Sequence, residues 1–341
     1  MSCYRFLSAA CTATAVFFSA GASAHDVTEK QRAAIDAHAL ATPSEIEADS
    51  KSLATYLVQD LHSDTEKVRA IYRWISDRIT YDVDAFLSGN VQSMSSAEVL
   101  QKRVSVCGGF SALFEELATQ AGLEVKSIAG YAKSYGTVQG THFEKPNHAW
   151  NAIKVDGEWR MVDATWGAGY VKEGKYSKVL SETFFLAPPE QFVFSHLPAE
   201  ERWQLQRTPH LSQQEFEALP LIQPTFFHND ISASEAWNTA KKSDFSGSFV
   251  HTFDLPYHVA AIQLAPLEYQ LKLDQAYQFK INTEVFEKIA LVQSNLWIEM
   301  DRQEQNFSIN FSSKIQGELQ VMAKKYGEPE YTSLLAYELR P

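Results

Sequence analysis

Residues 148–165 are HAWNAIKVDGEWRMVDAT, two runs of alternating apolar residues on either side of Asp156-Gly157. An Asp-Gly pair between such runs predicts a β-hairpin, because both residues of the tight turn need a positive φ. We expect one strand from His148 to Val155 and a second from Glu158 to Thr165. The most specific local signal in the chain therefore predicts paired strands near its middle.

The register of this hairpin brings an imidazole and a carboxylate together. If the turn has two residues, His148 lies opposite Thr165 and Trp150 lies opposite Asp163. Facing residues, and residues two apart, project from the same side of a sheet. His148 and Asp163 are then diagonal neighbours, about 7–8 Å apart, a gap that their side chains can bridge. A histidine oriented by a carboxylate forms the base and orienting half of a catalytic triad.

Cys107 is the candidate nucleophile. The chain has three cysteines, and the other two, Cys3 and Cys11, lie in a predicted signal peptide. Cys107-Gly-Gly-Phe110 opens a predicted helix, and a helix N-terminus lowers a thiol pKa and offers free amides to an oxyanion. We expect Gly108 and its neighbour to leave room for a substrate carbonyl. The alternative is a helix that merely begins with small residues.

The N-terminus has the pattern of a signal peptide. Arg5 supplies a positive charge, Phe6 to about Ala20 is apolar, and Ala22-Ser23-Ala24 suits a signal peptidase. We predict cleavage after Ala24, a periplasmic or secreted protein, and no stable membrane insertion after cleavage, because the apolar run is short. The mature chain would keep Cys107 as its one thiol, which in an oxidising compartment is either buried and inert or retained for reactivity.

The pattern along the chain predicts an α+β fold, in which a mixed helical and stranded part that contains the candidate site is followed by a C-terminal β-sandwich. Residues 27–80 have helical apolar spacing, and a capping box is predicted at Ser63–Glu66. A second capping box is predicted further along the chain, at Ser95–Glu98. From Phe226 onward, short apolar runs recur as strands. The expected domains are a signal peptide over 1–24, the enzyme domain with its N-terminal helices over 25–220, and the β-rich module over 221–341.

Composition excludes some classes of function. The chain has 341 residues and a net charge of −12, with no long basic run. A nucleic-acid surface needs clustered lysine and arginine to neutralise phosphates, so we expect no nucleic-acid partner. A hydrophobic share of 45% and a charged share of 21% are ordinary for a folded globular protein.

Each triad residue also has an ordinary explanation. The chain has ten histidines, so His148 taken alone is more often a packed or surface residue. Asp163 alone could bond to nearby backbone amides at a strand end. The joint placement of both residues with Cys107 favours a site. A metal centre is the least favoured hypothesis, because the three candidate ligands already have an explanation as a triad, and we expect no metal and no cofactor.

Weaker candidates surround these three residues. Gln101, six residues before Cys107, could supply an oxyanion-hole side chain, but an exposed helical glutamine is the favoured interpretation. Trp150 and Trp166 could wall a substrate groove, but aromatic residues on this face are more often part of a core. His196 is interpreted as structural.

Three short motifs carry a family resemblance. They are Cys107-Gly-Gly-Phe, Asn147-His-Ala-Trp-Asn151 and Asp163-Ala-Thr-Trp-Gly167, supported by Ile79-Thr-Tyr-Asp82, Gly130-Tyr-Ala-Lys133, His196-Leu-Pro198 and Trp203-Gln-Leu205. Together they resemble the transglutaminase-like superfamily, and within it the kyphoscoliosis-peptidase group and its bacterial relatives. The resemblance runs from about Val68 to Leu205.

This resemblance implies a papain-like α+β fold, no cofactor, and Cys107, His148 and Asp163 as nucleophile, base and orienting residue. Two positions depart from the pattern of the relatives, which often carry a glycine two residues before the cysteine and a tyrosine three after it. Here these residues are Ser105 and Phe110. Neither change touches the triad, but both lie near the entrance to the expected site.

The leading hypothesis is acyl transfer at a peptide or glutamine amide, in which Cys107 attacks the carbonyl and an amine leaves. Transfer to water would make a peptidase or amidase, which we favour because water is always present. Transfer to a lysine would make a protein-crosslinking transglutaminase. A hypothesis of another class is a non-catalytic binding or scaffold protein with a retired active site, against which the intact triad argues. The expected partner is a protein or peptide substrate, with the cell envelope as one source.

Overall fold

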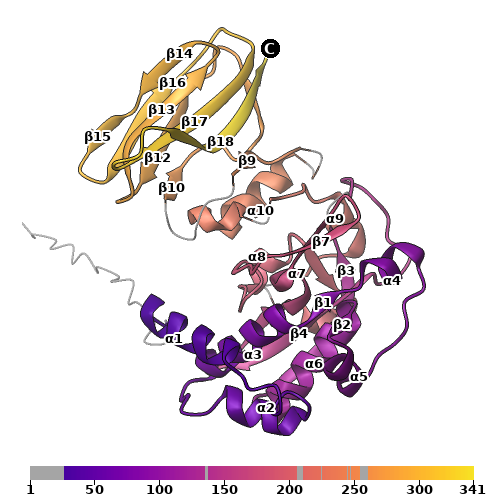
Figure 1. Ribbon diagram of the computed structural model, residues 1–341. Helices are drawn as coiled ribbons and strands as arrows, with labels where there is room; N and C mark the ends of the chain where they lie inside the picture. The colour runs from indigo at the N-terminus through magenta and orange to yellow at the C-terminus, as the bar shows by residue number, and fades with distance from the viewer. Residues whose placement is uncertain are drawn as a thin grey trace, which may run out of the picture.

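The computed structural model describes residues 27–134, 137–205, 210–223, 225–243, 245, 247–253 and 260–341. These residues form a mixed helical and stranded N-terminal half and a β-sandwich at the C-terminus, which confirms the predicted α+β fold class (Figure 1). The predicted signal peptide, its cleavage site after Ala24, Cys3 and Cys11 all lie outside the described residues. Within the described part of the chain, no helix has both the length and the apolar character to cross a membrane.

Six helices build the first layer of the N-terminal half within the described residues. Both predicted capping boxes are present, at the starts of α3 and α5, where a serine hydroxyl and a glutamate side chain bond reciprocally to backbone amides. The long helix that begins with Cys107 packs among the others through a shared apolar core. The helices are α1 (Glu29–Leu40), α2 (Ser50–Leu57), α3 (Asp64–Arg78), α4 (Val83–Ser88), α5 (Ser96–Lys102) and α6 (Cys107–Gln120).

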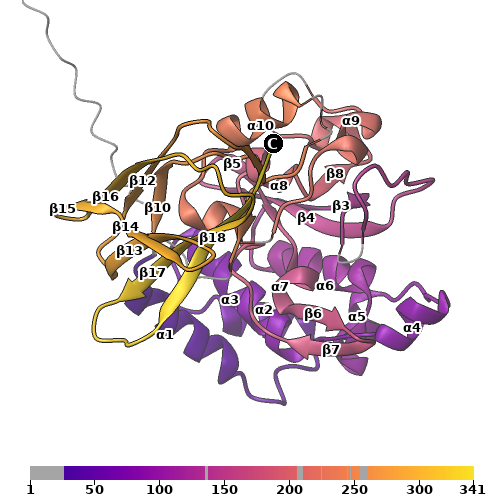
Figure 2. The ribbon, with the colours of Figure 1, turned by 90° about the horizontal axis from the view of Figure 1, so that it is seen from above.

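A four-stranded antiparallel sheet covers α6 (Figure 2). Its strand order is β5-β4-β3-β8, with β3 (Val125–Ala132), β4 (His148–Val155), β5 (Glu158–Val162) and β8 (His196–Pro198). The turn between β4 and β5 has φ of 52° at Asp156 and 86° at Gly157. The two strands pair from Val155 with Glu158 to Asn151 with Val162, so the predicted turn and register are confirmed.

The second strand of the hairpin ends earlier than predicted. β5 stops at Val162, and α7 (Ala164–Ala168) follows where the sequence pattern predicted strand to Thr165. Asp163 is the N-cap of α7, and its Oδ1 accepts hydrogen bonds from the backbone N–H groups of Thr165 at 2.8 Å and Trp166 at 3.1 Å. Aspartate is a favourable N-cap, so these bonds begin a helix and end the strand ladder. The predicted pairings of His148 with Thr165 and of Trp150 with Asp163 are therefore wrong.

Short elements complete the N-terminal half and lead from it into the C-terminal sandwich. The region from Phe226 to Lys242 contains a 3-10 turn and a helix, whereas the sequence analysis predicted strands from Phe226 onward. Ala236 and Ala240, four residues apart, are buried and face one side of the helix, a helical spacing that the strand prediction overlooked. The elements are β1 (Thr80–Tyr81), β2 (Val104–Ser105), β6 (Gly169–Lys172), β7 (Lys175–Lys178), α8 (Pro189–Phe192), η1 (Glu201–Trp203), α9 (Gln213–Ala218), η2 (Phe226–Asn229) and α10 (Ala233–Lys242).

Two sheets form the C-terminal sandwich, as predicted. One has the order β10-β12-β16-β15, and the other has the order β11-β18-β17-β13-β14 with β9 also paired to β18. The strands are β9 (His251–Thr252), β10 (Ala261–Leu264), β11 (Gln270–Lys272), β12 (Tyr277–Asn282), β13 (Phe286–Gln293), β14 (Leu296–Glu299), β15 (Asp301–Gln303), β16 (Asn306–Phe311), β17 (Gly317–Lys325) and β18 (Tyr331–Arg340).

A continuous apolar cluster crosses position 220, where the sequence analysis places a domain boundary. The cluster joins Val193 and Phe216 on one side of that position to Phe226 and Leu339 on the other. Polar contacts also cross it, because the side-chain amide of Gln139 donates hydrogen bonds to the carbonyls of Phe245 and Gly247. The division into 25–220 and 221–341 stays a prediction.

Gly130 offers a direct test of the packing in the sheet. A Cβ at this position would lie 2.3 Å from the carbonyl oxygen of Leu197 and 2.4 Å from Cη2 of Trp150. Because β8 and its neighbours would have to move, we expect Gly130→Ala to lower the free energy of unfolding by about 1–3 kcal/mol, measured by chemical denaturation. Gly108→Ala is the control, since a Cβ there meets nothing within 4 Å. Equal stability of Gly130→Ala and the wild type would contradict this packing.

Candidate active site

Buried hydrogen bonds tie the helix of Cys107 to the strand of His148. Ser111, one turn after Cys107, donates its hydroxyl to the carbonyl of Trp150 at 2.9 Å. Asn151 donates its side-chain amide to the carbonyl of Ser111 at 3.1 Å. Ser111 is 3% exposed and Asn151 is 0% exposed, so water does not compete for these bonds. They fix α6 against β4 and thereby hold Cys107 beside His148.

Cys107 is the first residue of α6 and has a polarised thiol. Its sulfur is hydrogen-bonded to the His148 side chain and accepts a hydrogen bond from the backbone N–H of Ala149. Burial raises the pKa of Cys107, but the hydrogen bond and charge of His148 and the Ala149 amide outweigh burial and hold that pKa below its ordinary value. Beside the thiol, Gly108 is exposed, and a Cβ there would enter open space. The sulfur of Cys107 is thus accessible from the Gly108 side.

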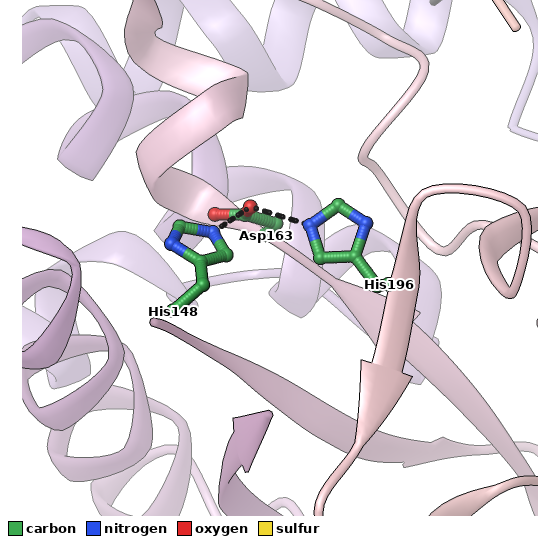
Figure 3. Close-up of side chains that lie close together, drawn as sticks. All are labelled: His148, Asp163 and His196. Atoms are coloured by element: carbon green, nitrogen blue, oxygen red, sulfur yellow. Dashed lines mark hydrogen bonds and ion pairs between the residues drawn. The ribbon is translucent and has the colours of Figure 1, made fainter. Parts of the chain in front are cut away.

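His148 lies between Cys107 and Asp163. Its Nε2 is 2.7 Å from Oδ2 of Asp163 (Figure 3). Nδ1 is therefore the ring nitrogen left for the hydrogen bond with Cys107. Burial lowers the pKa of His148, but the charge of Asp163 and the hydrogen bonds with Asp163 and Cys107 outweigh burial and raise it to about 10. A pKa of about 10 favours the imidazolium form of His148 at neutral pH, and the positive charge of that form favours the thiolate of Cys107.

The carboxylate of Asp163 is fully buried and accepts four hydrogen bonds. Oδ1 accepts from the backbone N–H groups of Thr165 and Trp166, and Oδ2 accepts from His148 at 2.7 Å and from His196 at 3.3 Å. Burial raises the pKa of Asp163, but the charge of His148 and the bonds from both histidines hold it well below its ordinary value. Asp163 is thus ionised at neutral pH and can orient the imidazolium of His148.

His196 is the site residue whose contact the sequence analysis missed. It belongs to β8, opposite Ala132 of β3, and it is 0% exposed. His196 lies 33 residues after Asp163, and no spacing pattern in the sequence predicts a contact between residues so far apart. The His196-Leu-Pro198 motif was the one available signal, and it carried only a family resemblance.

The weaker candidates lie in different surroundings. Gln101 is exposed on α5, and among the contacts of the described residues none joins it to Cys107, so its role at an oxyanion hole stays a prediction. Trp150 is 1% exposed and belongs to an apolar cluster. Trp166 is half-buried, with its ring centroid 5.1 Å from that of His148, and it lines a cleft of about 1390 Å³ that extends away from the triad.

Tyr81 is a neighbour of the site that the sequence analysis did not single out as a candidate. β1 pairs in parallel with β2, which places Tyr81 opposite Ser105, two residues before Cys107. Burial raises the pKa of Tyr81 above its ordinary value, and the charge of Cys107 adds to this rise. The ring lies 5.8 Å from that of Phe86 and 6.2 Å from that of Tyr176. Aromatic side chains therefore flank the start of α6.

The two histidines and Asp163 also form a potential metal-ligand set. Their ligand atoms lie within 4.8 Å of one another. A zinc ion would need to lie about 2.0–2.2 Å from each ligand atom, between the imidazoles and the carboxylate. Oδ2 of Asp163 instead lies 2.7 Å from Nε2 of His148, in direct hydrogen-bond contact. The arrangement fits proton-bearing imidazoles around a carboxylate better than it fits a metal ion.

Comparisons with known proteins agree with the motifs. The family model for the Transglutaminase-like superfamily matches residues 51–164, a segment that contains Cys107, His148 and Asp163. Kyphoscoliosis peptidase of Mus musculus is 35% identical over 175 residues, which are 50% of this chain and 26% of that protein. Hillarin of Drosophila melanogaster is 27% identical over 238 residues, which are 65% of this chain and 29% of that protein.

This chain thus spans little more than a quarter of the length of either curated relative. Among solved structures, that of a TGase is 20% identical, with a TM-score of 0.26, and the match covers 47% of this chain and 38% of that one. The family match includes the segment from α2 to the start of α7, which holds Cys107 and both strands of the hairpin. The match of residues 51–164 to the family model for the Transglutaminase-like superfamily confirms the resemblance that the motifs predict.

Proposed function

We propose that the protein is a cysteine enzyme that transfers acyl groups from peptide or glutamine amides, with Cys107, His148 and Asp163 as its catalytic triad. The hydrogen-bonded chain from the Cys107 thiol through His148 to the buried Asp163 carboxylate is the observation that supports this proposal. A thiolate beside an imidazolium provides both the nucleophile and the general acid that amide cleavage needs.

The reaction has two steps. The Cys107 thiolate attacks the amide carbonyl, and the imidazolium of His148 gives its proton to the leaving amine, which leaves a thioester on Cys107. Neutral His148 then takes a proton from the acceptor as the acceptor attacks the thioester, and the thiolate is released. Asp163 remains ionised and stabilises the imidazolium in both steps. The free amides at the start of α6 are placed to stabilise the oxyanion.

We favour water as the acceptor, so that the protein is a peptidase or amidase. The open space beside Gly108 leaves the thioester accessible to solvent. The peptidase name of the mouse relative also supports hydrolysis. Lysine as the acceptor would make a crosslinking transglutaminase, and a protein without turnover would be a binding or scaffold protein.

Activity on casein and on a mixture of denatured proteins distinguishes these functions. We expect the wild type to release ammonia or peptides faster than it incorporates a labelled primary amine. Cys107→Ala removes the nucleophile, so both rates should fall by at least about 10³-fold, with circular dichroism to check the fold. Faster amine incorporation than hydrolysis would contradict the preference for water. Turnover that persists in Cys107→Ala would contradict the triad.

We further propose that the protein is exported and acts on cell-envelope peptides or proteins. The apolar run and the Ala22-Ser23-Ala24 sequence support this proposal, because they have the form of a signal peptide with its cleavage site. Mass spectrometry of the protein recovered outside the cytoplasm should show a chain that starts at His25. A start at Met1, or recovery in the cytoplasm alone, would contradict export.

A further inference from the structure

We propose that His196 is a positioning residue, which donates a hydrogen bond to Asp163 and so holds the carboxylate that orients His148. This inference rests on the proposed function, because it adds a fourth residue to the Cys107–His148–Asp163 arrangement. From the sequence alone, His196 is interpreted as a structural residue. Its contacts favour a more specific role.

Both imidazoles approach the same carboxylate oxygen. Nε2 of His148 lies 2.7 Å from Oδ2 of Asp163, and Nε2 of His196 lies 3.3 Å from it (Figure 3). Their ring centroids are 5.5 Å apart, so the rings reach the carboxylate from different directions. The Asp163 and His196 side chains are both 0% exposed, and water cannot substitute for either donor.

The protonation state of His196 follows from its partners. Ionised Asp163 can only accept hydrogen bonds, so Nε2 of His196 must carry a proton. Burial lowers the pKa of His196 to about 4, although Asp163 opposes this shift, so the ring is neutral at neutral pH. Its Nδ1 is then unprotonated and accepts the hydroxyl proton of Ser195 at 2.8 Å. Asp163 thereby selects the tautomer of His196, and the Ser195 hydroxyl, which can donate or accept, matches it.

The two histidines differ in the group that contacts the ring nitrogen facing away from Asp163. His148 has the Cys107 thiolate on its far side and becomes charged, whereas His196 has a neutral hydroxyl there and remains uncharged. One ring can therefore exchange a proton with a substrate group during the reaction. The other can only hold the carboxylate.

Aromatic side chains lock the His196 ring in place. The ring stacks on Phe192 with centroids 4.0 Å apart and contacts Trp166 at 4.4 Å and Trp150 at 5.0 Å. Of the titratable groups, Asp163 and His148 act on His196, and α8, α7 and β4 otherwise present aromatic rings to it. A ring held this firmly fixes the position of the Asp163 oxygen.

Loss of this donor should raise the pKa of Asp163, because the buried carboxylate would lose one hydrogen bond and gain an apolar neighbour. As pH falls, Asp163 would then take up a proton earlier, His148 would lose its partner, and the Cys107 thiolate would lose the imidazolium. The effect should thus be confined to the acid side of the pH profile.

The test is the rate of Cys107 alkylation by iodoacetamide against pH, in the full chain, with the labelled residue located by mass spectrometry. His196→Phe keeps the stacking and removes the donor. We expect its rate to fall about tenfold relative to the wild type at the acid end of the profile, where Asp163 takes up its proton, and to match the wild type near the ordinary thiol pKa. His196→Gln restores an N–H donor without a titratable group and should return the rate to within about threefold of the wild type.

Each outcome decides the question. A His196→Phe protein that folds and alkylates like the wild type would overturn the proposal, and so would a His196→Gln protein as impaired as His196→Phe. If His196→Phe fails to fold, His196→Gln decides alone: a wild-type profile supports the donor role and a larger loss than threefold overturns it.

His148→Ala in the same series separates the two proposals. If His148→Ala matches the wild type, the proposed function fails, whereas a defect in His148→Ala alone removes only the role of His196.

Discussion

The buried carboxylate of Asp163 is the group on which the geometry of the site depends. A charge without solvent is costly unless it is paired and hydrogen-bonded, and Asp163 meets this requirement with two backbone amides and two imidazoles. These donors come from α7, β4 and β8. A single carboxylate thus begins a helix, orients the proposed base and joins two strands of the sheet that are separated by β3.

The state of Cys107 follows from the same constraint. A helix N-terminus contributes about 0.3–1 kcal/mol to a nearby negative charge, which is small beside the cost of burying a thiolate. The hydrogen bond and charge of His148 are therefore the main reason that the pKa of Cys107 is lowered. His148 keeps its charge because Asp163 keeps its own. The bonds of Ser111 with β4 add the remaining condition, since they hold α6 close enough for the pair to form.

Much of this site could be predicted from the sequence. The Asp-Gly turn determined the register of β4 and β5, and the pairing of Val155 with Glu158 placed His148 and Asp163 on the same side of the sheet. The prediction that His148 and Asp163 meet as diagonal neighbours on two strands was nevertheless wrong. Asp163 reaches His148 as the cap of α7, because two backbone amides compete successfully for its other oxygen.

Other features could not be predicted from local patterns. His196 meets Asp163 only because β8 pairs with β3, and a pairing across so many residues leaves no spacing signal in one sequence. Tyr81 reaches the start of α6 through the pairing of β1 with β2, two strands that α4 and α5 separate in the sequence. Helix α10 was missed because two small alanines carry its buried face, and small residues give a weak periodic signal.

Cys107 and His148 form a thiolate–imidazolium pair in the proposed mechanism. The pH dependence of Cys107 alkylation reports on this pair. The lowered pKa of Cys107 means that the thiolate persists below the ordinary thiol pKa of about 8.5. The wild-type rate should therefore stay high on the acid side of neutrality and change again only near pH 10, where His148 loses its proton. In His148→Ala the rate should follow an ordinary thiol. A wild-type rate that follows an ordinary thiol titration, and is indifferent to His148, would contradict the account.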